Sequence, residues 1–463
     1  KADPGNIAAI NALGAVRAAV GDKPGARKAY EQALSKDATF APATLNLVKL
    51  DQAEGRLDDA RKRLGAWLTV SPNDDNAMYE MGRVELAAGH RAEAQRWLEK
   101  AFGQRATNER AGIALVDVLL LQGAAQPALK VAGDLADANR ASLDAQAALA
   151  RAQLAAGERN KLLITLKEMT RQAEYDAVAQ VRIGRLQLMA ENPDGASYNA
   201  QKSLAALPGN LAALSLMGDA ELTRKDFVKA EAVGKDVIAH YPNSAEGYRI
   251  SGDAAVGQSN YAAAAQSYRG ALEREPSSGN AQRVAHAFAL GGDLPHALEA
   301  LTVWLKKNPD DLGVRAALAE THMRAGNWKG AREQYDKVLA VQPNAVGALN
   351  NQATVLQRLG DPSAASVAER AYKLAPQDPN VIDTYAWGLA TSGKLDQALQ
   401  LLRDARLRLP ESGEIRYHLA WTLVRLGRKA EAKEELVYAL KPGARFDSMV
   451  EAKGLMKELG GGV

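Results

Sequence analysis

The chain has 463 residues, of which 47% are hydrophobic and 24% are charged, a composition typical of a folded protein. Its 58 Lys and Arg nearly balance its 55 Asp and Glu, so a formal net charge of +3 gives no reason to expect nucleic acid as a partner. The absence of cysteine excludes disulfides, cysteine nucleophiles and cysteine-ligated metals. No apolar run in the sequence is long enough to predict a transmembrane segment.

A repeat of about 34 residues runs along the chain. Nine of the 17 prolines share one phase: Pro4, Pro72, Pro208, Pro242, Pro276, Pro309, Pro343, Pro376 and Pro410. A fixed period of this length is the signature of proteins built from stacked units, each of which needs its neighbours to bury its apolar face. The repeat is therefore the strongest signal in the sequence.

Within each unit, residue types recur at fixed positions. Position twenty is alanine in twelve of thirteen units, the exception being Leu162, and position eight is mostly glycine or alanine. Small residues at both positions let two antiparallel helices approach closely, and a large residue at position twenty-four fills the space beside them. Glycine at position fifteen, present in nine units, is typical of a helix end that needs a positive φ. The pattern predicts two helices per unit, with the weakest or most bent junctions at Leu162 and at the two 33-residue units, 245–277 and 312–344.

The predicted elements follow one another along the whole chain. Residues 1–6 are interpreted as the tail of a truncated upstream repeat, because Pro4 is in phase with Pro72, and we expect the native N-terminus to lie further upstream. Thirteen units then follow: 7–40, 41–74, 75–108, 109–142, 143–176, 177–210, 211–244, 245–277, 278–311, 312–344, 345–378, 379–412 and 413–446. Residues 447–463 are predicted to form a capping helix, which begins near Phe446, and a frayed end.

This pattern resembles the tetratricopeptide repeat over nearly the whole chain. The resemblance implies an all-α protein, an α-solenoid of about thirteen tetratricopeptide helix pairs closed by a C-terminal capping helix. It also implies a right-handed superhelix whose concave side is lined by the first helix of each pair. Proteins of this kind present extended surfaces to other molecules, so the prediction is a binding protein.

The sequence shows no pattern typical of catalysis or metal binding. The six histidines, His90, His240, His286, His296, His322 and His418, have no spacing of a metal site. We find no phosphate-binding loop, nucleophile elbow or dinucleotide motif. Paired carboxylates such as Asp58 and Asp59 lie at predicted helix starts, where capping and the helix dipole account for them. We therefore expect no enzyme activity, no cofactor and no metal.

Position nine of each unit is expected to face the groove, and its charge changes along the chain. The predicted basic groove stretch is Lys49, Arg83, Arg151 and Arg185, and the predicted acidic groove stretch is Asp219, Asp253 and Glu320. Two interpretations stay open: a charged groove that holds a protein segment, or a solvated surface whose order is accidental.

Tryptophan occupies position nine in the last two units. Trp387 and Trp421, one repeat apart, would form an apolar ledge for a peptide side chain or a sugar ring. The residues predicted around this ledge are Asn350, Asp383, Thr384, Tyr417, His418 and Arg425. The alternative is that both rings pack in the core between repeats. Trp67 and Trp304, at position twenty-seven of second helices, are predicted to be core residues.

The last two units carry a more specific resemblance. The segments Asp383–Gly388 and Gly427–Ala432, with the short helix after them, resemble the end of bacterial tetratricopeptide lipoproteins of the PEP-CTERM/exosortase system, the PrsT family, linked to exopolysaccharide secretion. The resemblance implies a periplasmic scaffold with an upstream lipid anchor. Its partners would be proteins of a secretion or envelope complex, and also the exopolysaccharide.

A second function remains open. The repeats could be a cytoplasmic substrate-recruiting or regulatory region of a larger enzyme, such as a glycosyltransferase. A signal peptide with a lipobox in the full-length gene would favour the periplasmic scaffold, and a catalytic domain there would favour the enzyme.

Overall fold

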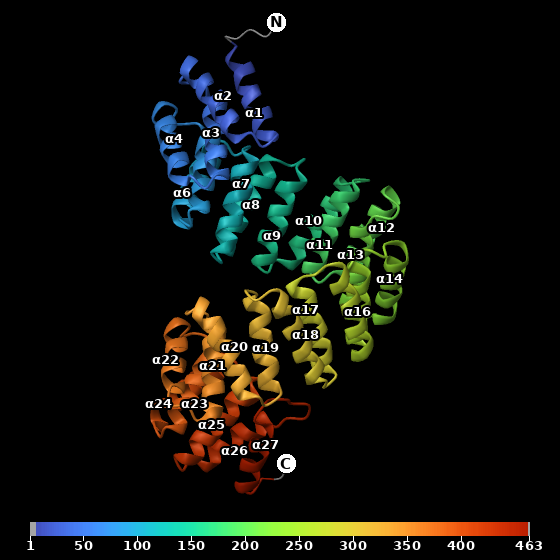
Figure 1. Cartoon of the computed structure of the whole chain (residues 1–463), viewed down its shortest axis with the longest axis vertical. Coiled ribbons are helices and arrows are strands. Elements are labelled where there is room, and N and C mark those ends of the chain that lie inside the picture. Colours follow the sequence, from blue (N-terminus) through green and yellow to red (C-terminus); the bar gives the residue numbers. More distant parts are fainter. Residues whose placement is uncertain (1–5, 462–463) are drawn as a thin grey trace. The chain divides into compact units, whose positions relative to one another are not determined.

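The computed structural model describes residues 6–461, and within that range the chain forms 27 helices and no strand (Figure 1). The prediction of an all-α fold built from successive helix pairs is confirmed. None of the helices in this range combines the length and the apolar character needed to cross a bilayer. Most of the predicted tail 1–6 and the last two residues of the predicted frayed end lie outside the described residues.

The chain divides into two compact units, Lys1–Val233 and Gly234–Val463. The helices of the first unit are α1 (Ile7–Ala19), α2 (Lys23–Lys36), α3 (Ala41–Ala53), α4 (Leu57–Val70), α5 (Asp75–Ala87), α6 (Arg91–Gln104), α7 (Glu109–Leu121), α8 (Ala125–Ala138), α9 (Leu143–Ala155), α10 (Arg159–Gln172), α11 (Ala177–Met189), α12 (Pro193–Ala206) and α13 (Leu211–Thr223). Helix α14 (Phe227–His240) crosses the division.

The helices of the second unit are α15 (Glu246–Gly257), α16 (Tyr261–Arg274), α17 (Ser278–Leu290), α18 (Leu294–Lys307), α19 (Leu312–Arg324), α20 (Trp328–Val341), α21 (Val346–Leu359), α22 (Ala364–Leu374), α23 (Pro379–Thr391), α24 (Leu395–Arg408), α25 (Gly413–Arg425), α26 (Lys429–Ala439) and α27 (Met449–Glu458). Odd-numbered helices up to α25 are the first helices of their pairs. From α1 to α11 and from α15 to α25, each odd-numbered helix packs on the even-numbered helix that follows it.

Small residues set the distance between the two helices of a pair. A Cβ atom added to Gly82 on α5 would lie 2.7 Å from Cγ of Leu98 and 3.3 Å from the carbonyl oxygen of Ala94, both on α6. Ala94 and Leu98 have no exposed surface, so neither can move aside. The same arrangement recurs in the second unit, where a Cβ on Gly252 would lie 2.4 Å from the ring of Tyr268. Positions eight, twenty and twenty-four thus meet as predicted.

The turn inside each pair requires a left-handed residue. The nine glycines predicted at position fifteen all have positive φ, between 68° and 87°. Where glycine is missing, Glu191, Lys225 and Ser259 adopt the same conformation, with φ of 54°, 62° and 59°. These three residues carry a Cβ that is crowded at positive φ, so the turn geometry persists at a local energetic cost.

Two tryptophans join consecutive repeats. The indole Nε1 of Trp67 donates to Oδ2 of Asp74 at 2.8 Å, and that of Trp304 donates to Oδ2 of Asp311 at 2.7 Å. Both aspartates also accept backbone N–H groups as the N-caps of the next helices, α5 and α19. Each ring packs against a buried apolar cluster, as predicted for core residues.

The C-terminal helix begins later than the sequence suggested. Helix α27 starts at Met449 rather than near Phe446, because the backbone N–H and hydroxyl of Ser448 donate to the carboxylate of Glu414 at 3.0 and 2.6 Å. The ring of Phe446 fills the space where a Cβ on Gly413 would come within 2.4 Å. The segment before α27 is therefore fastened to α25.

Replacing Gly82 with alanine tests the close approach of the paired helices. We expect Gly82→Ala to lower the free energy of unfolding by about 1–2 kcal/mol, because the new methyl group overpacks the interface. Gly65→Ala is the matched control: Gly65 lies exposed in α4 with open space around it, and alanine there should stabilise the chain by about 0.5–1 kcal/mol. Urea titration of both variants checks this, and equal effects would contradict it.

Candidate functional site

The second unit contains a pocket of about 900 Å³ lined by α21, α23, α25 and the segment that precedes α27. We call it the C-terminal pocket. Six of the eight residues predicted to form or surround the tryptophan ledge line it: Asn350, Asp383, Thr384, Trp387, Tyr417 and His418. The other two lie on α25, where the ring of Trp421 contacts that of Trp387 and the guanidinium of Arg425 lies over the ring of Trp421. Residues from three successive repeats thus converge on one cavity.

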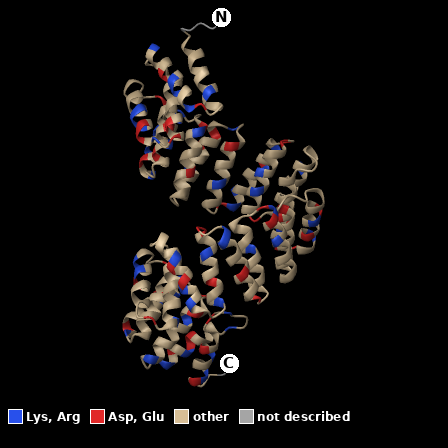
Figure 2. Ribbon diagram, viewed as in Figure 1, with Lys and Arg blue, Asp and Glu red and all other residues tan. Residues whose placement is uncertain are grey.

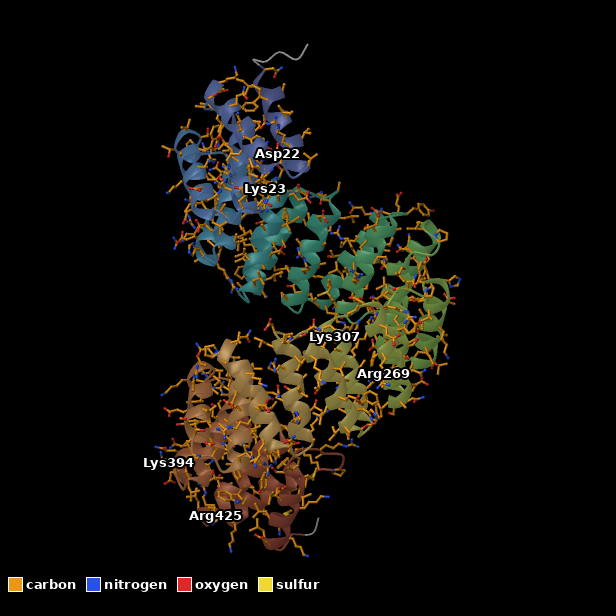
Figure 3. All side chains as sticks on the ribbon, viewed as in Figure 1. Asp22, Lys23, Arg269, Lys307, Lys394 and Arg425 are labelled. Atoms are coloured by element: carbon orange, nitrogen blue, oxygen red, sulfur yellow. The ribbon has the colours of Figure 1, made fainter. Side chains whose placement is uncertain are left out.

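The two tryptophans meet, but they do not form a flat ledge. Their ring centroids lie 5.0 Å apart at an interplanar angle of 74°, so one ring points its edge at the other. The imidazole of His418 stacks on Trp387 at 4.1 Å and 17°. The guanidinium of Arg425 lies 4.7 Å from the centre of the Trp421 ring, and Figure 3 labels this residue. Part of each indole is therefore covered by a side chain of the protein itself.

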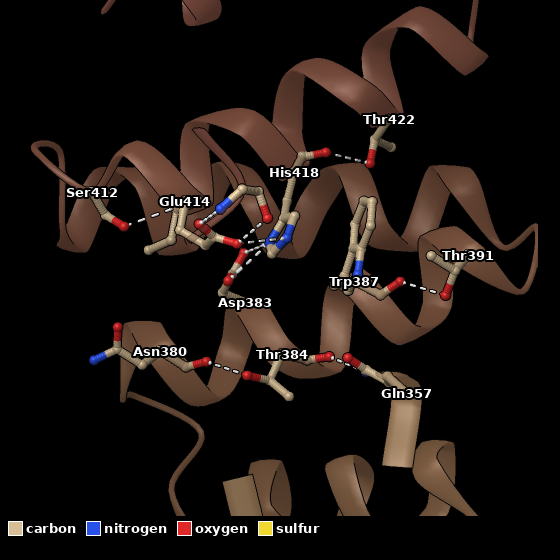
Figure 4. A network of polar contacts seen from close by, with 12 residues as sticks. Gln357, Asn380, Asp383, Thr384, Trp387, Thr391, Ser412, Glu414, His418 and Thr422 are labelled. Atoms are coloured by element: carbon tan, nitrogen blue, oxygen red, sulfur yellow. Dashed lines mark hydrogen bonds and ion pairs between the residues drawn. The ribbon is translucent and has the colours of Figure 1, made fainter. Parts of the chain in front are cut away.

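A buried polar network lies against the pocket (Figure 4). Nδ1 of His418 lies 2.9 and 3.0 Å from the two carboxylate oxygens of Asp383, and both side chains are buried. On the other side of the ring, Nε2 lies 3.5 Å from Oε1 of Glu414. An imidazole between two carboxylates is well placed to carry a positive charge.

The surroundings of His418 act on its pKa in opposite directions. Burial alone lowers the pKa, since a charged ring is poorly solvated in the interior. The charge of Asp383, its hydrogen bond and the charge of Glu414 outweigh this effect, and the pKa of His418 is raised above its ordinary value. The raised pKa favours the charged ring, whose two nitrogens then both donate toward the carboxylates of Asp383 and Glu414.

Some residues of the pocket carried no recognisable signal in the sequence. Nε2 of Gln357 donates to the backbone oxygen of Thr384 at 3.0 Å, and Ser448 fastens Glu414 as described above. Glu414 lies four residues before His418, so helical spacing could have indicated that the two share a face. Nothing local in the sequence indicates that Ser448 returns to α25.

The chemistry of the pocket is that of recognition. Aromatic rings of Trp387 and Tyr417 are combined with polar side chains, and Oδ1 of Asn350 is buried without a hydrogen-bond partner among residues 6–461. Such a mixture is typical of small-molecule and peptide sites. Across residues 6–461, no group of three or more His, Asp or Glu side chains is arranged to hold a metal ion.

In the structure, the members of the two charged stretches differ from one another in their partners and in their exposure. Arg151 pairs with Asp117 of the preceding repeat at 2.7 Å, and Arg83 pairs with Glu80 on its own helix at 3.0 Å. Asp253 accepts the hydroxyl of Tyr268 at 2.6 Å. Of the remaining members, Lys49, Arg185 and Glu320 are exposed and Asp219 is partly buried. Figure 2 shows both signs of charge interspersed over the helices of each unit.

The ionisation of His418 should make stability depend on pH. Because its pKa is raised in the folded state, the protonated ring contributes its full stabilisation below about pH 6.5, the ordinary value for histidine. That contribution is lost as the pH rises through the folded-state pKa. Urea unfolding between pH 5.5 and 9 should show this loss in the unmodified chain and not in His418→Gln. His240→Gln, which alters an exposed histidine, is the control, and parallel profiles for the unmodified chain and His418→Gln would contradict the expectation.

Comparisons with known proteins place the repeat in a family. Models described as tetratricopeptide repeat match residues 17–81, 251–311, 288–352 and 389–444. Cellulose synthase operon protein C of Pseudomonas fluorescens is 27% identical over 181 residues, which are 38% of this chain and 13% of that protein. A TPR repeat-containing protein of Pseudomonas aeruginosa is 30% identical over 142 residues, which are 29% of this chain and 23% of that protein. The chain thus spans less than a quarter of the length of either relative.

Solved structures with similar helix arrangements include yeast Tom70, at 16% identity and a TM-score of 0.43, covering 96% of this chain and 98% of that one. The APC/C hetero-tetramer Cut9–Hcn1 gives 13% identity and a TM-score of 0.42, covering 98% of this chain and 96% of that one. Tetratricopeptide repeats therefore occupy the matched segments, and successive helices of similar length fill the stretches between them.

Proposed function

We propose that this protein is a non-catalytic scaffold in the export or assembly of a bacterial surface polysaccharide, and that the C-terminal pocket binds a sugar ring of the polymer. The observation that carries the proposal is the pocket itself, in which Trp387 and Tyr417 are combined with side-chain amides, hydroxyls and carboxylates. Sugars are commonly held by an aromatic face with hydrogen bonds around the ring, and this pocket offers both.

Two further considerations support the proposal. One relative is a protein of a cellulose synthase operon, although this chain covers only 13% of its length. The fold supplies the second, since stacked helix pairs present long surfaces to protein partners. As part of the same proposal, the scaffold acts in the periplasm with a lipid anchor, like the PrsT-type lipoproteins that its last two units resemble.

Tryptophan fluorescence titrated with cello-oligosaccharides and with oligosaccharides of the host exopolysaccharide tests the pocket. We expect a saturable change for at least one of them. Trp387→Ala should weaken its binding by about 2 kcal/mol, or roughly thirtyfold, because it removes an aromatic contact at the centre of the site. Repeating the titration at low and high salt distinguishes a sugar from a charged peptide. The affinity for a sugar stacked on an aromatic ring should depend little on salt, whereas the affinity for a charged peptide should fall.

The control is Trp97→Phe, which alters a tryptophan of the first unit, far along the chain from the pocket. Circular dichroism should show unchanged helix content in both variants. An affinity unchanged in Trp387→Ala would exclude the pocket as the sugar site. No response to any oligosaccharide would overturn the sugar proposal and leave proteins of the envelope complex as the ligands to test.

A further inference from the structure

The first unit contains a second hollow, separate from the C-terminal pocket. It has a volume of about 510 Å³ and is lined mainly by the first helices of three consecutive repeats, α7, α9 and α11. We call it the arginine groove. Its rim carries Arg151, Arg182 and Arg185 together with two carboxylates, and its accessible floor consists of Ile113, Leu143, Ala147 and Leu186.

The charges of the rim do not balance. Arg151 pairs with Asp117 at 2.7 Å, and Arg182 pairs with Asp144 at 2.5 Å. Arg185 is exposed and makes no ion pair or hydrogen bond with any residue in the described range 6–461. The groove therefore presents one guanidinium that is not compensated by a carboxylate of the protein.

A ligand can also bind the guanidinium of Arg182, because separating that side chain from Asp144 costs little free energy. The pair of Arg182 with Asp144 has side chains that are 57% and 54% exposed, and ion pairs at such exposure contribute little to stability. A carboxylate of a ligand can replace Asp144 as the partner of Arg182. Because Arg182 and Arg185 are three residues apart on α11, their side chains lie on one side of the helix and can bind neighbouring acidic groups.

The apolar floor of the arginine groove indicates which kind of ligand side chain lies beside those acidic groups. Ile113, Leu143 and Leu186 are only partly buried, so they leave aliphatic surface open to a ligand. Among the described residues that line the groove, none is aromatic, unlike in the C-terminal pocket. A sugar ring would find no face on which to stack, whereas a Leu, Ile or Val side chain would gain by burial there.

We infer that the arginine groove binds a segment of a protein partner in which aspartate or glutamate lies beside an aliphatic residue. The acidic side chains contact Arg185 and Arg182, and the aliphatic side chain covers Leu143 and Leu186. This inference does not rest on the sugar proposal, because it concerns different helices and a different ligand. If both hold, the scaffold carries a protein partner on its first unit and the polymer on its second.

An array of synthetic decapeptides tests the inference on the unmodified full chain. The peptides vary the spacing between one or two Asp or Glu residues and one Leu or Ile in an otherwise Ser and Gly background. We expect binding by a subset that has both residue types, and a lower affinity at high salt. The double variant Arg182→Ser/Arg185→Ser should weaken that binding at least tenfold, because each lost guanidinium removes charge-assisted hydrogen bonds.

Arg171→Ser is the matched control, since Arg171 is an exposed arginine of α10 outside the groove and should leave peptide binding unchanged. Trp387→Ala should also leave it unchanged, which separates this result from the sugar test. Binding by no peptide, or binding that the double variant leaves intact, would overturn the inference. Binding of oligouronates without binding of peptides would overturn it as well and assign the groove to an anionic polymer.

Discussion

The close contact between the two helices of each pair is the constraint on which the rest of the structure depends. Where Gly82 meets Ala94 and Leu98, there is no room for one more carbon atom. A contact this tight fixes the rotation of both helices about their axes as well as their distance. Once the rotation is fixed in every pair, each position of the repeat has a defined direction throughout the array.

This regularity builds the candidate sites. Asp383 and His418 are 35 residues apart in sequence and yet in hydrogen-bond contact, because they lie at neighbouring positions of consecutive repeats. Trp387 and Trp421, separated by one repeat, meet for the same reason. The first helices of adjacent repeats supply most of the lining of both pockets, and the segment before α27 completes the C-terminal one.

The sequence pattern predicted the helices closely, because glycine, alanine and proline act through local geometry that is the same in every repeat. The repeat phase also identified six residues that line the C-terminal pocket. What it could not predict depends on tertiary contacts. The orientation of the Trp387 ring is set by stacking on His418, and the start of α27 is set by the bonds of Ser448 to Glu414. Within the described part of the chain, Arg185 has no carboxylate partner because of where the neighbouring Asp and Glu residues lie in space, which a pattern of charge along the sequence does not show.

Glu191, Lys225 and Ser259 hold a left-handed backbone in three consecutive repeats. Each such residue is about 1 kcal/mol less favourable there than glycine would be. In a stack, every repeat is supported only by its neighbours, so three weakened turns in succession lower the local free energy of opening more than three scattered ones would. We therefore expect the amide hydrogens of this interior segment to exchange earlier than those of the repeats on either side. Unfolding can then begin in the middle of the chain as well as at its ends, and the repeats before and after this segment can respond separately to their ligands.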